Sequence, residues 1–372
     1  MKYYLIAGER SGDLHGSNLM KEIRKQDPDA VFRGFGGDYM RTAGLDIFIH
    51  YQDMAFMGLV ALFLNLRTLL GRLRQCKEDI LKYQPDVVIL IDYGAFNKRI
   101  AKFCKTNGVK NYYYISPKVW AWYQLRAKEL KRNVDRMFCI LPFEKDFFKR
   151  FNWDVDYVGN PVLDAIKAFK PQPDFLQKNK IATNGHLVAL LPGSRKSELV
   201  KIIPLMATVI EANPDYHFVV AAVRSMPEHM YRPLLRFSNV QIVFDETYDL
   251  LSHAHAAIVT SGTAALETGL FKVPQVVVYK ANRFEYAIAK LMIKVQFVSL
   301  VNLILNREAI RELLQKEAKP INVIVELRRL VEDGFYRDRM ANDYEELLSI
   351  LDTGSASENA ARLMVGYLKE GV

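Results

Sequence analysis

The sequence is poor in cysteine and has no long hydrophobic segment. Its 372 residues include three cysteines, Cys76, Cys104 and Cys139, whose spacing does not match a metal site. They lie in apolar or helical contexts, which is typical of buried free thiols in a reducing compartment. The apolar run at the N-terminus is too short for a signal peptide, and no run reaches the roughly 18 residues of a membrane span. We therefore expect a cytoplasmic protein without a membrane span.

Charge is unbalanced in favour of basic residues. The chain carries 51 Lys and Arg against 42 Asp and Glu, a net charge of +9. Such an excess fits an anionic partner, which is nucleic acid, a phosphorylated substrate or an acidic membrane surface. The basic residues are dispersed rather than grouped with aromatic residues, and the chain has no RNA-binding signature. These features argue against nucleic acid as the partner.

Short apolar runs recur along the chain, and many lead through a polar, glycine-containing turn into a helical pattern. Examples are Tyr3–Ala7 and Pro85–Ile91 in the first half and Leu187–Leu191 in the second. Runs of this kind are typical of parallel strands that are buried on both faces. The alternation of strand and helix therefore predicts parallel sheets that are covered by helices on both faces.

A polar segment separates two series of alternating strands and helices. Residues 170–185, KPQPDFLQKNKIATNG, contain two prolines and few apolar residues, so we place a linker there. The result is an α/β fold of two Rossmann-like domains, 1–169 and 186–345, that face each other across a cleft. Residues 346–372 are expected to form a charged helical tail, either solvated or packed against a partner.

The segment His186–Leu199 combines an apolar strand, a glycine turn and the start of a helix. The N–H groups of such a turn and the positive end of the helix attract an anion, and Arg195 can add a bidentate contact. We interpret Gly193, Ser194 and Arg195 as a cradle for a diphosphate, with Glu198 as a carboxylate beside it. For this segment alone, an ordinary turn between strand and helix is an equally good interpretation.

A second turn of this kind follows the apolar segment 256–259. The turn residues are Ser261, Gly262, Thr263 and Ala264. Glu267 lies one helical turn further on, where its carboxylate can accept hydrogen bonds from both ribose hydroxyls of a nucleotide. The alternative is that Ser261 or Thr263 only caps the helix. Further along, Asn302 is flanked by apolar residues and is expected to face the cleft.

Polar residues follow two buried strands of the first half. Glu9, Ser11 and Asp13 lie after the first strand, and Asp92 follows the strand that ends at Ile91. In open α/β sheets the carboxyl ends of the strands bind ligands, and a buried acid there is costly without a task. We therefore predict Asp92 as a general base, with Glu9, Ser11 and Asp13 facing the same cleft. The alternative is that Asp92 caps the next helix.

Two further features, a pair of tryptophans and a glutamate, receive no specific functional role from the sequence. Trp120 and Trp122 follow a predicted strand at 111–115, and they either stack on a sugar or base or pack in the core. Glu144 opens a helix, where its charge is favourable at the positive end.

The segment Met54–Leu66 is unusually apolar, with Asn65 as its one polar residue. It is too short to span a bilayer. It is either a buried core helix or a helix whose apolar face enters a membrane surface or holds an acyl chain. The flanking residues Arg67, Arg72 and Arg74 favour an interfacial helix beside anionic head groups, although a solvated basic face is the simpler explanation of these arginines.

Taken in chain order, these motifs resemble one family from end to end. They are AGERSGDLHG (7–16), GFGG (34–37), MGLV (57–60), IDYGAFN (91–97), YYISPKVWAW (113–122), ILPFE (140–144), VGNPVLD (158–164), LLPGSRKSE (190–198), SGTAALE (261–267) and SLVNLIL (299–305). The sequence resembles the lipid-A-disaccharide synthases, which are inverting glycosyltransferases of the glycosyltransferase-B fold.

The resemblance implies a reaction and a set of partners. A 2,3-diacylglucosaminyl group passes from its uridine diphosphate (UDP) to 2,3-diacylglucosamine 1-phosphate, which forms a β-1,6-linked disaccharide without a metal or other cofactor. The first domain would bind the acceptor and the second the UDP-sugar. The implied partners are the lipid-linked substrates, the anionic surface of the inner membrane and a second copy of the chain through C-terminal elements.

The sequence departs from the family pattern at three positions. Gly94 replaces a proline, Ala61 replaces a glutamate and Val301 replaces a proline. Two other functions stay open on the residues alone. One is a UDP-sugar epimerase on the same double-Rossmann frame, and the other is a non-catalytic binder of anionic lipid or RNA.

Overall fold

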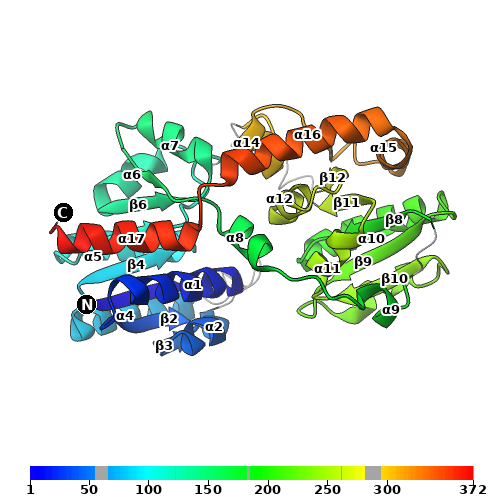
Figure 1. The fold of residues 1–372 in the computed structure, drawn as a ribbon. Coiled ribbons are helices and arrows are strands. Elements are labelled where there is room, and N and C mark those ends of the chain that lie inside the picture. Colours follow the sequence, from blue (N-terminus) through cyan, green and yellow to red (C-terminus); the bar gives the residue numbers. More distant parts are fainter. Residues whose placement is uncertain (55–65, 122, 182–184, 261, 281–294, 372) are drawn as a thin grey trace. The chain divides into compact units, whose positions relative to one another are not determined.

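The computed structural model describes residues 1–54, 66–121, 123–181, 185–260, 262–280 and 295–371, and the chain forms two compact units (Figure 1). Unit 1 comprises Met1–Pro161 and Asp352–Val372, and unit 2 comprises Val162–Leu351. The division after Pro161 lies before the linker predicted at 170–185. A second division after Leu351 assigns the predicted tail partly to unit 2 and partly to unit 1.

Unit 1 is built on a parallel seven-stranded sheet with the order β3-β2-β1-β4-β5-β6-β7. Its strands are β1 Lys2–Ala7, β2 Val31–Gly36, β3 Leu45–His50, β4 Val87–Ile91, β5 Asn111–Tyr114, β6 Arg136–Cys139 and β7 Asp156–Tyr157. Its helices are α1 Arg10–Gln26, α2 Asp38–Thr42, α4 Leu66–Tyr83, α5 Gly94–Thr106, α6 Arg126–Asn133, α7 Pro142–Lys149 and α17 Ala356–Lys369, with a 3₁₀ turn, η1, at Tyr51–Met54.

The last helix of the chain is part of the core of unit 1. Helix α17 packs against α1, and Figure 1 shows the two side by side in red and blue. Its apolar residues Ala360, Met364 and Val365 join the buried cluster that contains Leu19 and Ile23 of α1. The part of the tail at 356–369, which we expected to be either solvated or packed against a partner, is therefore a core helix of unit 1.

Unit 2 is built on a parallel six-stranded sheet with the order β10-β9-β8-β11-β12-β13. Its strands are β8 Leu187–Leu191, β9 His217–Ala222, β10 Val240–Phe244, β11 Ala256–Thr260, β12 Gln275–Tyr279 and β13 Arg311–Leu314. Its helices are α9 Phe175–Lys178, α10 Lys196–Glu211, α11 Thr247–His253, α12 Thr263–Leu270, α14 Leu300–Leu305, α15 Pro320–Glu332 and α16 Gly334–Leu351, with 3₁₀ turns η2 Glu228–Met230 and η3 Arg232–Leu234. Helix α8, Pro161–Ala168, begins at the division between the units.

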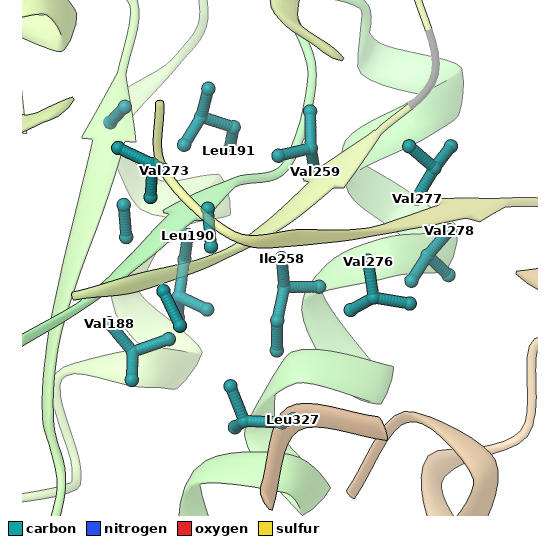
Figure 2. Packing of buried hydrophobic residues seen from close by; sticks show 14 of the residues in the cluster. Val188, Leu190, Leu191, Ile258, Val259, Val273, Val276, Val277, Val278 and Leu327 are labelled. Atoms are coloured by element: carbon teal, nitrogen blue, oxygen red, sulfur yellow. The ribbon is translucent and has the colours of Figure 1, made fainter. Parts of the chain in front are cut away.

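The core of unit 2 is made by branched apolar side chains of its central strands. Figure 2 shows Val188 and Leu190 of β8, Ile258 of β11 and Val276 of β12 packed together, with Leu327 of α15 below them. Strands that are buried on both faces require such continuous apolar runs. The predicted fold class, two Rossmann-like α/β domains, is confirmed.

Both sheets reverse their strand order at one point. In unit 1 the order reverses between β1 and β4, and in unit 2 it reverses between β8 and β11. At such a point the loops that leave the two strands turn away to opposite faces of the sheet, and ligands bind at the carboxyl ends of the strands. The loops after these four strands are the ones that carry the predicted acidic residues and glycine turns.

Candidate active site

Two acidic residues of unit 1 lie together at the reversal of the strand order. Strands β1 and β4 are neighbours, with Ala7 opposite Ile91, so Glu9 and Asp92 leave the sheet side by side. Glu9 is the N-cap of α1, but its side chain makes no capping hydrogen bond. Its charge acts on the Asp92 carboxyl. The structure thus brings the two predicted acids into one electrostatic site, with the exposed Ser11 in the first turn of α1.

The backbone of Asp92 is held in an uncommon conformation. Asp92 and Tyr93 have φ angles of 44° and 47°, in the left-handed region that costs non-glycine residues about 1 kcal/mol or more. The carbonyl of Asp92 accepts hydrogen bonds from the Tyr113 hydroxyl at 2.6 Å and the Asn97 amide at 2.8 Å. Its N–H donates to the Tyr114 carbonyl at 3.0 Å. These contacts fix the direction in which the carboxylate leaves the strand.

The pKa of Asp92 is raised to about 6. Burial is the main cause because it disfavours the charged form, and the negative charge of Glu9 adds to it. The Lys118 ammonium and the Tyr93 N–H lower the pKa in part. A carboxylate with this pKa is ionised at pH 7 and yet basic enough to accept a proton from a hydroxyl, which suits a general base.

Asp13 has a structural role that differs from the prediction. It is 1% exposed, and its carboxylate accepts hydrogen bonds from the N–H groups of Gly37 at 2.7 Å, Tyr39 at 3.1 Å and Met40 at 3.0 Å. It therefore caps α2 and ties the first motif, 7–16, to the GFGG segment. Its oxygens serve this cap, so it is not one of the groups that face a ligand.

The sequence interpretation missed the role of Glu144. Its carboxylate is 1% exposed and accepts hydrogen bonds from the Ser116 hydroxyl, from Trp120 Nε1 at 3.0 Å, and from the N–H groups of Ile140 and Leu141 at 3.2 and 3.0 Å. Burial raises the pKa of Glu144 to about 7, and the donors oppose this rise. Trp120, 5% exposed, is a core residue, whereas Trp122 lies outside the described residues.

The glycine turn after β8 is occupied by a carboxylate of the protein itself. One oxygen of Glu198 accepts hydrogen bonds from the N–H groups of Ser194 at 3.1 Å and Arg195 at 3.2 Å. Gly193, with φ of 102°, allows this approach because a side chain there would collide with Glu198. Glu198 thus takes the donors that we predicted for a diphosphate. The Arg195 side chain is 77% exposed, and its guanidinium lies 3.4 Å from Glu198.

The turn after β11 differs from the first because none of the side chains that the structure describes caps its helix. Gly262, with φ of 137°, is the N-cap of α12, and it has no side chain to bond the first N–H groups. Thr263 is therefore the first helical residue rather than the cap, and Ala264 follows it. An uncapped helix start of this kind is suited to an anion. Ser261 lies outside the described residues.

Glu267 is oriented by a tyrosine that the sequence did not point to. The Tyr248 hydroxyl donates to Glu267 Oε1 at 2.8 Å. The Tyr248 ring lies against Phe169 and Phe271, with ring centroids 5.4 and 5.1 Å away. Burial raises the pKa of Glu267, and the tyrosine hydrogen bond opposes the rise. The carboxylate keeps acceptor sites for a further ligand, because Tyr248 uses one of about four.

Asn302 is a scaffold residue of unit 2, which corrects its predicted place among the substrate-binding groups. It is 0% exposed, and its amide donates to the Ile310 carbonyl at 2.8 Å and to Glu312 at 2.9 Å. Its oxygen accepts from the N–H groups of Ala309 and Ile310 at 2.9 and 3.0 Å. All hydrogen-bonding positions of the side chain are used. No polar atom of Asn302 is left for a ligand.

Two predicted features concern metals and membranes. In the described part of the chain, no group of three or more His, Cys, Asp or Glu residues could hold a metal ion. Among the same residues, no helix is long and apolar enough to cross a bilayer. The apolar stretch predicted as core or interface, 54–66, falls almost entirely on residues 55–65, which lie outside the described residues.

The paired Rossmann-like units place the chain in the glycosyltransferase-B fold class. A glycosyltransferase of kitacinnamycin matches the fold with a TM-score of 0.66 at 15% identity, over 99% of both chains. The UDP-GlcNAc 2-epimerase of Neisseria meningitidis, solved with UDP-GlcNAc bound, matches with a TM-score of 0.66 at 13% identity, over 100% of both chains. At these identities the likeness shows the fold alone.

The sequence comparisons identify the family within this class. The family model for lipid-A-disaccharide synthetase matches residues 3–364. The lipid-A-disaccharide synthase of Syntrophus aciditrophicus is 34% identical over 98% of this chain and 97% of its own length. The chain belongs to the lipid-A-disaccharide synthase family and is a glycosyltransferase of lipid A biosynthesis. The family implies sugar-nucleotide and lipid-linked substrates, and it does not favour the epimerase or binding-protein alternatives.

The raised pKa of Asp92 predicts that this residue destabilises the fold. The folded state binds a proton more tightly than the unfolded state, so the cost grows as pH rises from about 4 to about 6 and is complete above that range. We expect Asp92→Asn to increase the free energy of unfolding by about 1–3 kcal/mol at pH 8, and by much less at pH 4. Urea unfolding at both pH values measures the difference. The control is Asp29→Asn, an exposed carboxylate of unit 1, and a loss of stability at pH 8 for Asp92→Asn would contradict the prediction.

Proposed function

We propose that the chain transfers a 2,3-diacylglucosaminyl group from UDP to the 6-hydroxyl of 2,3-diacylglucosamine 1-phosphate, and that Asp92 is the general base. The family membership supports the substrates. The observation that carries the role of Asp92 is its place beside Glu9 where the strand order of unit 1 reverses, with a pKa raised to about 6.

The proposed reaction is a single displacement with inversion. Asp92 accepts the proton of the acceptor hydroxyl while the hydroxyl oxygen forms a bond to the anomeric carbon of the donor. The bond from that carbon to the diphosphate oxygen breaks, and its electron pair leaves with UDP. A base of this kind contributes about 10²–10⁴-fold to the rate. Glu9 and Ser11 are assigned to contact the sugar or to orient Asp92, and one displacement needs no enzyme nucleophile.

Unit 2 is proposed to hold the donor. The uncapped start of α12 at Gly262–Ala264 offers N–H groups to the diphosphate, and the exposed Arg195 guanidinium offers a cation. Both would offset the charge that grows on the leaving group. Glu267, oriented by Tyr248, is assigned to the ribose. The N–H groups of Ser194 and Arg195 become available to a phosphate only if Glu198 gives them up.

The transfer assay tests the proposal directly. Purified protein with both lipid substrates should form the disaccharide, detected by mass, and Asp92→Asn should lower turnover by about 10²–10⁴-fold because the amide cannot accept the proton. Donor affinity should stay within about twofold, since Asp92 belongs to the other unit. Asp29→Asn is the control. Near-normal turnover of Asp92→Asn would remove it from the base role, and a single-sugar product would favour an epimerase.

The role of Arg195 is tested by UDP binding. Arg195→Ala should weaken the affinity for UDP by about 10–100-fold, because a charged hydrogen bond to phosphate is lost. The matched control is Arg236→Ala. Arg236 is exposed and precedes β10, so it lies on the side of the sheet where the strands begin, whereas Arg195 follows the end of β8. Calorimetric titration measures both. Equal affinities of the two variants would contradict a phosphate contact by Arg195.

We also propose that residues 54–66 contact an anionic membrane surface at the inner membrane. The apolar composition of this stretch and the basic residues that follow it support this. Replacing Leu62, Phe63 and Leu64 by serine should release the protein from anionic vesicles in a flotation assay. Serine at the exposed residues Val200 and Leu235 is the control. Retained binding with an unchanged circular dichroism spectrum would contradict the proposal. A homodimer and the absence of a nucleic-acid partner stay predictions.

A further inference from the structure

Glu144 is a deeply buried carboxylate that the proposed reaction does not use. Its two oxygens divide their partners between two segments of unit 1. Oε1 accepts from Ser116 and Trp120, which lie in the loop after β5. Oε2 accepts from the N–H groups of Ile140 and Leu141, which lie at the end of β6. One side chain therefore fastens the loop 115–121 to the start of α7.

These contacts require two oxygen atoms on the side chain of Glu144. All four partners present a donor, and a carboxylate provides about four acceptor positions. An amide would place its NH2 group against Trp120 Nε1 or against the two backbone N–H groups and leave a buried donor unpaired, which costs about 1–3 kcal/mol, whereas a protonated carboxyl can donate to the Ser116 oxygen. The attachment of the loop thus depends on both oxygens of Glu144 and not only on the shape of the side chain.

The same loop packs against the turn that carries Asp92. A Cβ atom placed on Gly94 would lie 3.1 Å from Cβ of Pro117, so the backbone after Asp92 and the loop are in close contact. The loop begins just after Tyr114, whose carbonyl accepts from the Asp92 N–H at 3.0 Å. Lys118, next to Pro117, is exposed, and its positive charge acts on the Asp92 carboxyl.

The groups around Asp92 have opposite effects on its proton affinity. Burial and the charge of Glu9 favour the protonated form, whereas Lys118 and the N–H of Tyr93 favour the carboxylate. Tyr113 contacts only the backbone carbonyl of Asp92. Lys118 is therefore the one cation acting on Asp92 among the described residues, and its position depends on the loop.

We propose that Glu144 is a positioning residue for the transfer reaction, which holds the loop 115–121 against the Asp92 turn and so keeps the Lys118 ammonium beside the base. The proposal rests on the proposed role of Asp92. Lys118 stabilises the ionised base, and Glu144 acts on the base through Lys118.

The test is the pH dependence of kcat for wild type, Lys118→Met and Glu144→Gln. The reaction needs ionised Asp92, so activity falls as pH drops through its pKa. Loss of Lys118 raises that pKa, and the acidic limb should move up by about half a pH unit. Glu144→Gln should move it in the same direction. Lys128→Met, an exposed lysine on α6, should leave the limb in place. Titration of the substrate phosphates affects the pH profiles of wild type and variants equally, because all of them use the same substrates.

The double variant separates positioning from a general loss of structure. If Glu144 acts through Lys118, Lys118→Met/Glu144→Gln should shift the limb no further than Lys118→Met alone. A fall in kcat at all pH values without a shift, or shifts that add, would overturn the proposal. If Glu144→Gln does not fold, Trp120→Phe removes the indole N–H donor and leaves a smaller aromatic ring. An inactive Asp92→Asn with an unmoved limb in Lys118→Met refutes this inference alone, whereas an active Asp92→Asn refutes the base itself.

Discussion

The register between neighbouring parallel strands is the constraint on which the sites of both units depend. Ala7 lies opposite Ile91 in unit 1, and Val259 lies opposite Leu191 in unit 2. Ala7, Ile91 and Leu191 are the last residues of their strands and Val259 is the last but one of β11, so in each unit the two loops at the reversal start within one residue of the same level. The hydrogen bonds within the apolar sheet thereby set the spacing of the polar groups that follow the carboxyl ends of its strands. A shift of register in either pair would separate the acids of unit 1 or the two glycine turns of unit 2.

The second constraint is the cost of burying carboxylates, which the protein meets in three ways. Asp13 is surrounded by backbone donors and serves as a cap. Glu144 also has a full set of donors, yet burial still raises its pKa to about 7. Asp92 has its backbone, rather than its carboxylate, tied to Tyr113 and Asn97, and the charge stays poorly compensated. A group that is left uncompensated in this way is available to take a proton from a substrate.

The fold and the acidic pair could be predicted because they depend on local patterns. Apolar runs that end in turns predict parallel strands, and acidic residues that follow such runs lie together at the carboxyl ends of the strands. The partners of single side chains could not be predicted in this way. Asn302 looked free because its neighbours are apolar, but its partners lie at residues 309–312, beyond the helix it belongs to. Glu144 takes two of its partners from a loop more than twenty residues earlier in the chain, and no periodicity reveals such a contact.

The return of α17 to unit 1 has a consequence for how the chain acquires its structure. Unit 2 is one continuous segment, whereas the apolar face of α1 is covered by residues 356–369. During synthesis, unit 2 can fold as soon as its own residues have left the ribosome. Unit 1 lacks the helix that packs beside α1 until residues 356–369 have emerged. The unit whose strands are synthesised before unit 2 is thus completed only after unit 2, and in the interval part of its apolar surface is exposed.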